Sequence, residues 1–119
     1  MDVKAFYNSI GGDYATAISR LMRDSLAEKF ILKFVNDPSF AQLAEAVKRE
    51  DWDAAFGAAH TLKGVSMNLA FAKLSDVTIT LTDALRPQNA DSRNAKSLKA
   101  MFEAVETEYN KVISEIRKG

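Results

Sequence analysis

The stretch Leu98–Ile116, LKAMFEAVETEYNKVISEI, decides the fold of this chain. Its large apolar residues recur at every third or fourth position, with successive spacings of 4, 3, 4, 3 and 4. They are Leu98, Phe102, Val105, Tyr109, Val112 and Ile116. Because an α-helix has about 3.6 residues per turn, these side chains form one apolar stripe along a helix. Such a stripe is typical of a helix in an antiparallel bundle.

The middle of the chain supplies the other bundle helices. Asp37-Pro38 predicts a helix start, with the aspartate as N-cap and the proline at the first helical position. Asp51 predicts the N-cap of a helix that continues to about Leu69, and apolar residues from Leu74 to Leu85 predict another. Arg86-Pro87-Gln88-Asn89 predicts a stop followed by a loop.

The first 36 residues carry helical periodicity of their own. Gly11-Gly12 separates a short helix, at about residues 2–9, from a stretch that begins near Asp13 and runs to about Asn36. A break in that stretch is expected around residues 23–25. The many apolar side chains here need a partner, either the end of the bundle or a second copy of the chain.

The expected fold is therefore all-α. We predict one domain over residues 1–119, in which residues 37–118 form an up-and-down antiparallel four-helix bundle. Residues 1–36 add N-terminal helices that pack on the bundle as a cap. Because the seams of the bundle look filled by one chain, a monomer is expected.

Composition excludes several classes of function. Sixteen basic residues balance sixteen acidic ones, so nucleic acid and membrane partners are not expected. Cysteine is absent, which excludes disulfides and thiolate metal sites. No signal-peptide pattern and no apolar run of about 20 residues is present, and we expect a cytoplasmic protein.

The only histidine, His60, lies in the run Ala59-His60-Thr61-Leu62-Lys63-Gly64. With Leu62 at the centre of the buried face of the helix, His60 lies about 160° away and faces outward. Five further residues share this outward face: Phe56, Gly57, Lys63, Gly64 and Met67. Each interior glycine costs a helix about 1 kcal/mol relative to alanine, so their presence beside His60 indicates a surface kept open.

The sequence allows several interpretations of the role of His60. A lone surface histidine is usually just solvated, and a metal site lacks a second histidine or cysteine. A Ser-His-Asp hydrolase lacks a visible orienting acid and oxyanion hole. A nucleophilic role fits better, because imidazole can attack a phosphoryl group and Lys63, one turn later, can lie beside the added charge. Gly64 would leave room for a loop of the second protein that must supply the phosphoryl group.

The run from Ala59 to Leu69 resembles the signature of the histidine phosphotransfer (HPt) domains of multistep phosphorelays. The pattern of that family reads H-x-L-K-G-x-S-x-x-L-G, with alanine before the histidine. The chain matches it at Ala59, His60, Leu62, Lys63, Gly64, Ser66 and Leu69. It departs at Ala70, where the family has glycine and the helix turns toward the next one.

The resemblance implies a function and a set of partners. His60 would accept a phosphoryl group from the aspartate of a receiver domain and return it to the aspartate of another receiver. The partners would be response-regulator receivers or a hybrid histidine kinase, and Mg²⁺ would belong to the receiver, so this chain would need no cofactor of its own. Lys63 would stabilise the phosphoryl charge, and Gly64 would admit the receiver loop. Phe56, Gly57 and Met67 would contact the partner.

The sequence leaves alternatives open. The two glycines could instead pack against a neighbouring helix, and the N-terminal helices could cover Phe56 and Met67. The bundle could bind or sequester a receiver without chemistry, although the retained His60 and Lys63 argue against this. A sensor kinase fragment would need a glycine-rich nucleotide-binding segment and an acidic residue directly after the histidine, and the chain has neither.

Overall fold

The structure, a computed structural model, describes residues 1–119 and is built from helices alone. Seven α-helices and one short 3₁₀ helix follow one another along the chain. They are α1 (Val3–Ile10), α2 (Tyr14–Leu21), α3 (Asp24–Phe34), α4 (Ser39–Lys48), α5 (Trp52–Asn68), α6 (Ala72–Leu85), η1 (Pro87–Ser92) and α7 (Ala95–Lys118). The prediction of an all-α fold is confirmed.

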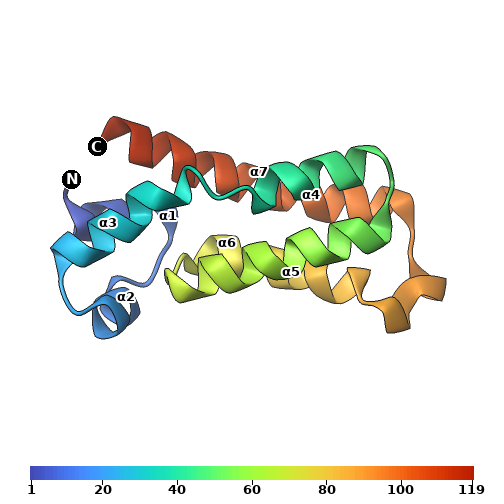
Figure 1. Ribbon diagram of the computed structural model, residues 1–119, viewed down its shortest axis with the longest axis horizontal. Helices are drawn as coiled ribbons and strands as arrows, with labels where there is room; N and C mark the ends of the chain where they lie inside the picture. The colour runs from blue at the N-terminus through green and yellow to red at the C-terminus, as the bar shows by residue number, and fades with distance from the viewer.

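Helices α4, α5, α6 and α7 form an up-and-down antiparallel bundle (Figure 1). Each of the first three packs against the next, and α4 closes the bundle by packing against α7. Helix α7 has 24 residues and runs along the long axis of a molecule that measures 45 × 24 × 19 Å. Its buried residues include Leu98, Val105, Val112 and Ile116, which lie on the stripe expected from the sequence.

The three N-terminal helices gather at one end of the bundle, beside the C-terminal end of α7 (Figure 1). Helix α1 packs against α7, and α3 leads directly into α4. The predicted break falls between Leu21 and Asp24, where Met22 has a positive φ of 75°. The expectation of additional N-terminal helices packed on the bundle is confirmed, and we call α1, α2 and α3 together the cap.

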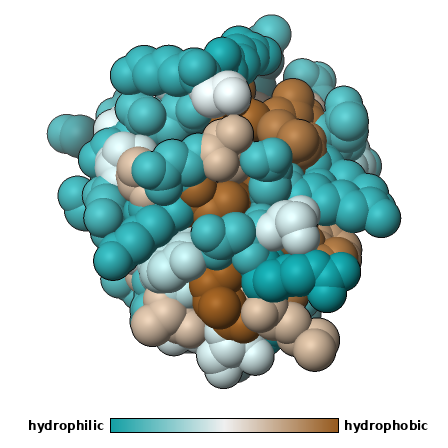
Figure 2. Space-filling model, turned by 90° about the vertical axis from the view of Figure 1, so that its left-hand side faces the viewer, coloured by the Kyte–Doolittle hydropathy of each residue, from teal (hydrophilic) through white to brown (hydrophobic).

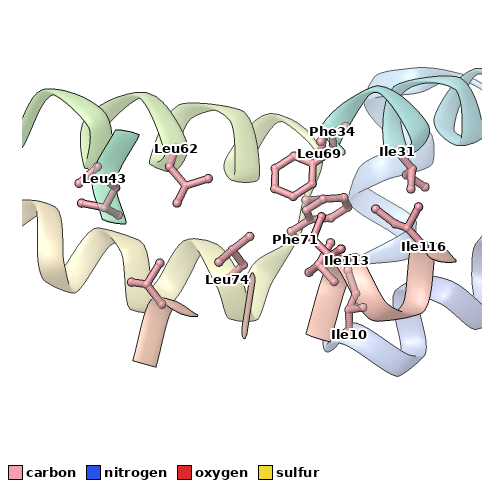
Figure 3. Packing of buried hydrophobic residues seen from close by; sticks show 14 of the residues in the cluster. Ile10, Ile31, Phe34, Leu43, Leu62, Leu69, Phe71, Leu74, Ile113 and Ile116 are labelled. Carbon is pink, nitrogen blue, oxygen red and sulfur yellow. The ribbon is translucent and has the colours of Figure 1, made fainter. Parts of the chain in front are cut away.

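One continuous core joins the bundle to the cap. Phe71, which is fully buried, lies where the two meet, and Figure 3 shows it among Phe34, Leu69 and Ile113. The Phe34 ring meets it edge-on at a centroid distance of 5.2 Å, and the Phe6 ring does so at 5.8 Å. Edge-to-face contacts of this kind add to the stabilisation from apolar burial. The cap is therefore packed through the core rather than merely tethered to it.

The start of α4 differs from the prediction by one residue. Pro38 occupies the cap position, with a φ of −84°, and Ser39 is the first helical residue. The Asp37 carboxylate accepts hydrogen bonds from the backbone N–H of Ser39, at 2.9 Å, and from its hydroxyl. Asp37 still serves the free N–H groups of the helix start, but from one position further out.

The segment after α6 is more ordered than the expected loop. Residues 87–92 form a 3₁₀ helix, because Pro87 fixes a φ suited to a first helical position. Arg93 then anchors the segment: its guanidinium pairs with Asp53 at 3.1 Å and donates to the Leu85 carbonyl at 2.7 Å. These contacts join the end of α6 to the first turn of α5.

Candidate functional site

Helix α5 presents one buried face and one open face. The Asp51 carboxylate caps its start by accepting from the Ala54 N–H at 3.1 Å, as the sequence predicts. Leu62 and Ala59 are fully buried, whereas His60 between them along the helix is exposed. The imidazole therefore points away from the core, as the helical periodicity requires.

Small residues hold α5 close to its neighbours. Ala55, Ala59 and Ser66 are all fully buried, and small side chains let packed helices approach one another. The Ser66 hydroxyl donates to the Leu62 carbonyl at 2.9 Å, so this buried polar group is satisfied within its own helix. The result is a helix that is closely packed on one side and open on the side of His60.

Phe56 lies beside His60 on the same stripe of α5. The two ring centroids are 6.0 Å apart, with the rings inclined at 55°. The Arg86 guanidinium lies over the same ring, 5.9 Å from the Phe56 centroid, and its Nε donates to Asp83 at 3.1 Å. Phe56 is therefore half-buried by the C-terminal end of α6 and not by the cap.

Arg86 is a neighbour of the site that the sequence did not reveal. It follows α6 directly, whereas Phe56 lies in the second turn of α5. Only the register between these two antiparallel helices brings them together. No motif in the sequence carries that register.

The two glycines of α5 face open space. A Cβ atom added at Gly57 or at Gly64 would meet nothing within 4 Å. Close packing against another helix therefore does not explain either glycine, and that alternative is excluded. Together they leave bare backbone on the side of His60 opposite Phe56.

Lys63 and Met67 complete the open face of α5. Lys63 is half-buried and forms no ion pair within the protein, so its ammonium group is free to meet an incoming anion. The Met67 side chain is 44% exposed, and its carbonyl accepts a hydrogen bond from Arg20 of α2. The cap thus binds the backbone carbonyl of Met67 and leaves the residue largely exposed.

The turn after α5 keeps the geometry that a glycine would supply. Ala70 adopts a left-handed φ of 57°, and its carbonyl accepts the Asp13 N–H at 2.9 Å. The carbonyl of Gly11 in turn accepts the Lys73 N–H at 3.2 Å. The cap therefore holds this turn from both sides, and the departure from the expected glycine leaves the helix end at Asn68.

Gly12 and Tyr7 bring the cap against the same turn. A Cβ atom at Gly12 would lie 2.6 Å from the Tyr7 ring and 3.1 Å from the Ala70 carbonyl oxygen, so only glycine fits. The Tyr7 hydroxyl donates to the Leu69 carbonyl at 2.7 Å. Burial raises the pKa of Tyr7 to about 12.

The structure contains no cluster of three or more His, Cys, Asp or Glu side chains that could hold a metal ion. None of its helices combines the length and the apolar character that crossing a membrane requires.

Comparison with known proteins identifies the family to which the chain belongs. The model of the Hpt domain family matches residues 36–108, which is more than half of the chain. The match covers α4, α5, α6 and the first half of α7, and it contains His60. No curated protein and no solved structure matched the chain. The chain therefore belongs to the Hpt domain family, whose members are histidine phosphotransfer modules of phosphorelay signalling.

Proposed function

We propose that His60 accepts a phosphoryl group from the aspartyl phosphate of a receiver domain and passes it to the aspartate of another receiver. One observation supports this most strongly. The only histidine of a chain in the Hpt family stands exposed on α5, with bare backbone at Gly57 and Gly64 beside it.

The transfer is a substitution at phosphorus. A ring nitrogen of His60 uses its lone pair to form the P–N bond, while the bond from phosphorus to the receiver's carboxylate oxygen breaks. The carboxylate leaves with that electron pair, and the imidazole keeps the proton on its other nitrogen. Return of the group to a second carboxylate runs the same step backwards.

Lys63 is the cation placed to stabilise the phosphoryl group. It lies three residues after His60, which puts both side chains on neighbouring positions of one helix face. Its ammonium group has no partner within the protein, so an arriving phosphoryl group would not have to displace a carboxylate. We propose electrostatic stabilisation of the transferred group as its role.

The remaining open-face residues form the contact surface around the transfer point. Gly57 and Gly64 leave space for the receiver's loops, while Phe56 and Met67 offer apolar contact. The receiver would bring Mg²⁺ and the aspartate, so the chain would act as a phosphoryl carrier without a cofactor rather than as an enzyme. A hybrid histidine kinase that carries a receiver domain would meet the same surface. We further propose that the chain works as a cytoplasmic monomer.

The experiment uses a receiver domain charged on its aspartate with labelled phosphate. We expect acid-labile, base-stable label on the wild-type chain and none on His60→Gln. Absence of label on the wild type with every receiver tried contradicts the proposal. Label that persists in His60→Gln would show that another residue accepts the phosphoryl group, and label from ATP alone would indicate a kinase.

A further inference from the structure

The residues next to His60 on its own helix differ greatly in bulk. Neighbours on a helix surface lie three and four residues away, and for His60 they are Phe56, Gly57, Lys63 and Gly64. The two glycines present no side chain, and Lys63 is a flexible chain that forms no ion pair. Phe56 is therefore the one rigid side chain that α5 places beside the imidazole.

Phe56 lies on the side toward which the imidazole leans. In an α-helix each Cα–Cβ bond tilts toward the N-terminus, so a long side chain covers the turn before its own. The turn before His60 carries Phe56 and the bare Gly57, and the centroids of the Phe56 and His60 rings are 6.0 Å apart. The Phe56 ring therefore limits the orientations that the imidazole can adopt.

The Phe56 ring is restrained in its turn. It is half-buried and packs against the hydrophobic core, and the Arg86 guanidinium lies over it at 5.9 Å from the centroid. A cation in this position is attracted to the face of an aromatic ring. The core contacts and the cation together restrict the movement of the ring.

Arg86 extends from a fixed backbone. Pro87 follows it and favours the extended conformation that Arg86 has, with a ψ of 141°. The Arg86 N–H donates to the Asp83 carbonyl at 3.3 Å, and its Nε donates to the Asp83 carboxylate at 3.1 Å. The end of α6 therefore holds the guanidinium where it meets Phe56.

The other side of His60, toward the cap, is open. Met67 follows His60 by two turns of α5 and is 44% exposed. Figure 2 shows this end of the molecule, where hydrophobic atoms reach the surface between hydrophilic side chains. Uncovered apolar surface thus lies toward the cap, whereas the chain's own Arg86 covers part of Phe56. This difference favours a role for Phe56 within the chain.

Resting on the proposed function, we infer that Phe56 is a positioning residue for phosphoryl transfer and that Arg86 acts through it. The Phe56 ring confines the imidazole, so that a ring nitrogen stays directed outward, where the phosphoryl group arrives. Side chains on helices mainly use two χ1 rotamers, so removal of the ring should spread the imidazole over further orientations. The fraction of molecules oriented for attack at phosphorus, and with it the rate, should fall by about threefold.

The first test measures the imidazole without any receiver. Phosphoramidate phosphorylates histidine directly, because the ring nitrogen attacks phosphorus and ammonia leaves. We expect Phe56→Leu to lower this rate by about threefold, and Phe56→Tyr, which keeps the ring, to change it by less than about 1.5-fold. Phe102→Leu is the matched control and should leave the rate unchanged, because Phe102 is also half-buried but lies on α7.

Nuclear magnetic resonance supplies a second readout, which loss of stability alone would not change. Three-bond couplings between the backbone and the His60 ring report the χ1 rotamer. We expect one dominant rotamer in wild type and a mixture in Phe56→Leu and in Arg86→Gln. Arg49→Gln is the control for Arg86: Arg49 follows α4 as Arg86 follows α6, and it also pairs with a carboxylate of its own helix, Glu45, at 3.6 Å.

A double-mutant cycle tests whether Arg86 acts through Phe56. We expect Arg86→Gln alone to lower the phosphoramidate rate by about twofold, and to add nothing in the double variant with Phe56→Leu. Additive effects overturn the link between the two residues. An unchanged phosphoramidate rate in Phe56→Leu overturns the positioning role, even where transfer from a receiver is slower. A phosphoramidate rate that depends on Phe56, without transfer from any receiver, keeps the positioning role and overturns the proposed transfer.

Discussion

The Tyr7 hydroxyl donates a 2.7 Å hydrogen bond to the Leu69 carbonyl, which joins the first helix of the chain to the end of the helix that carries His60. The Leu69 carbonyl lies just beyond α5, where it has lost its intrahelical partner. The cap therefore completes the hydrogen bonding of α5. Residues 1–36 are part of the structure that positions the site, although the family match begins only at residue 36.

Tyr7→Phe tests this junction. Removing the hydroxyl leaves the buried Leu69 carbonyl without a donor, which should lower the free energy of unfolding by about 1–2 kcal/mol. Urea denaturation measures the change. Tyr14→Phe serves as control, because the hydroxyl of Tyr14 bonds the exposed Asp24 carboxylate. Equal losses in the two variants would show that the Tyr7 hydrogen bond stabilises the fold no more than the exposed hydrogen bond of Tyr14.

The burial of Tyr7 also leads us to expect that the free energy of unfolding falls at high pH. Burial raises its pKa from 10 to about 12 in the folded state, so the protonated phenol stabilises the fold. That stability is fully present below pH 10 and is lost as the pH rises from about 10 to about 12. Unfolding free energy measured across this window should fall by up to about 3 kcal/mol more in wild type than in Tyr7→Phe. Parallel curves contradict the assignment.

Ala70→Gly is expected to stabilise the protein. Ala70 holds a left-handed φ of 57°, which costs an alanine about 1 kcal/mol that glycine does not lose. Thermal melting should therefore shift upward by a few degrees. Ala104→Gly, in the exposed interior of α7, is the control and should shift melting downward. A lower melting temperature for Ala70→Gly means that the alanine methyl contributes more packing than its conformation costs.

Substitutions of the glycines beside His60 should affect stability and phosphoryl transfer in different ways. Because a Cβ at Gly64 meets nothing, Gly64→Ala should raise the free energy of unfolding by about 1 kcal/mol. Gly64→Gln should fold equally well but slow transfer from a receiver by at least about tenfold, because its side chain enters the space of the partner. Phosphoramidate labelling of His60 measures the imidazole without a partner and should stay unchanged. Full transfer activity in Gly64→Gln would show that Gly64 is not part of the contact surface.

Much of the bundle follows from local sequence. The stripe from Leu98 to Ile116 predicts α7, and the same periodicity around Leu62 predicts that His60 is exposed, as it is in the structure. Both depend only on helical geometry and on which side chains avoid water. The cap helices and the break after Leu21 were predictable for the same reason.

Relationships between distant helices were not predictable. The contact of Arg86 with Phe56 depends on the register of α5 against α6, and the hydrogen bond from the Asp13 N–H to the Ala70 carbonyl depends on where the cap lies against the turn after α5. The apolar groove lined by Leu21, Phe30 and Val65 likewise requires α2, α3 and α5 to meet in a particular way. Tertiary packing sets each of these, and a single sequence carries no periodic signal for it.

The most direct measurement follows one phosphoryl group through the chain. The wild-type protein is labelled from a charged receiver, separated from that receiver, and mixed with a second, uncharged receiver in the absence of ATP. We expect the label to sit on His60 and then to move to the aspartate of the second receiver, with no transfer in His60→Gln. Label that never reaches His60, or that leaves it only as free phosphate, contradicts the role of this chain as a phosphoryl carrier.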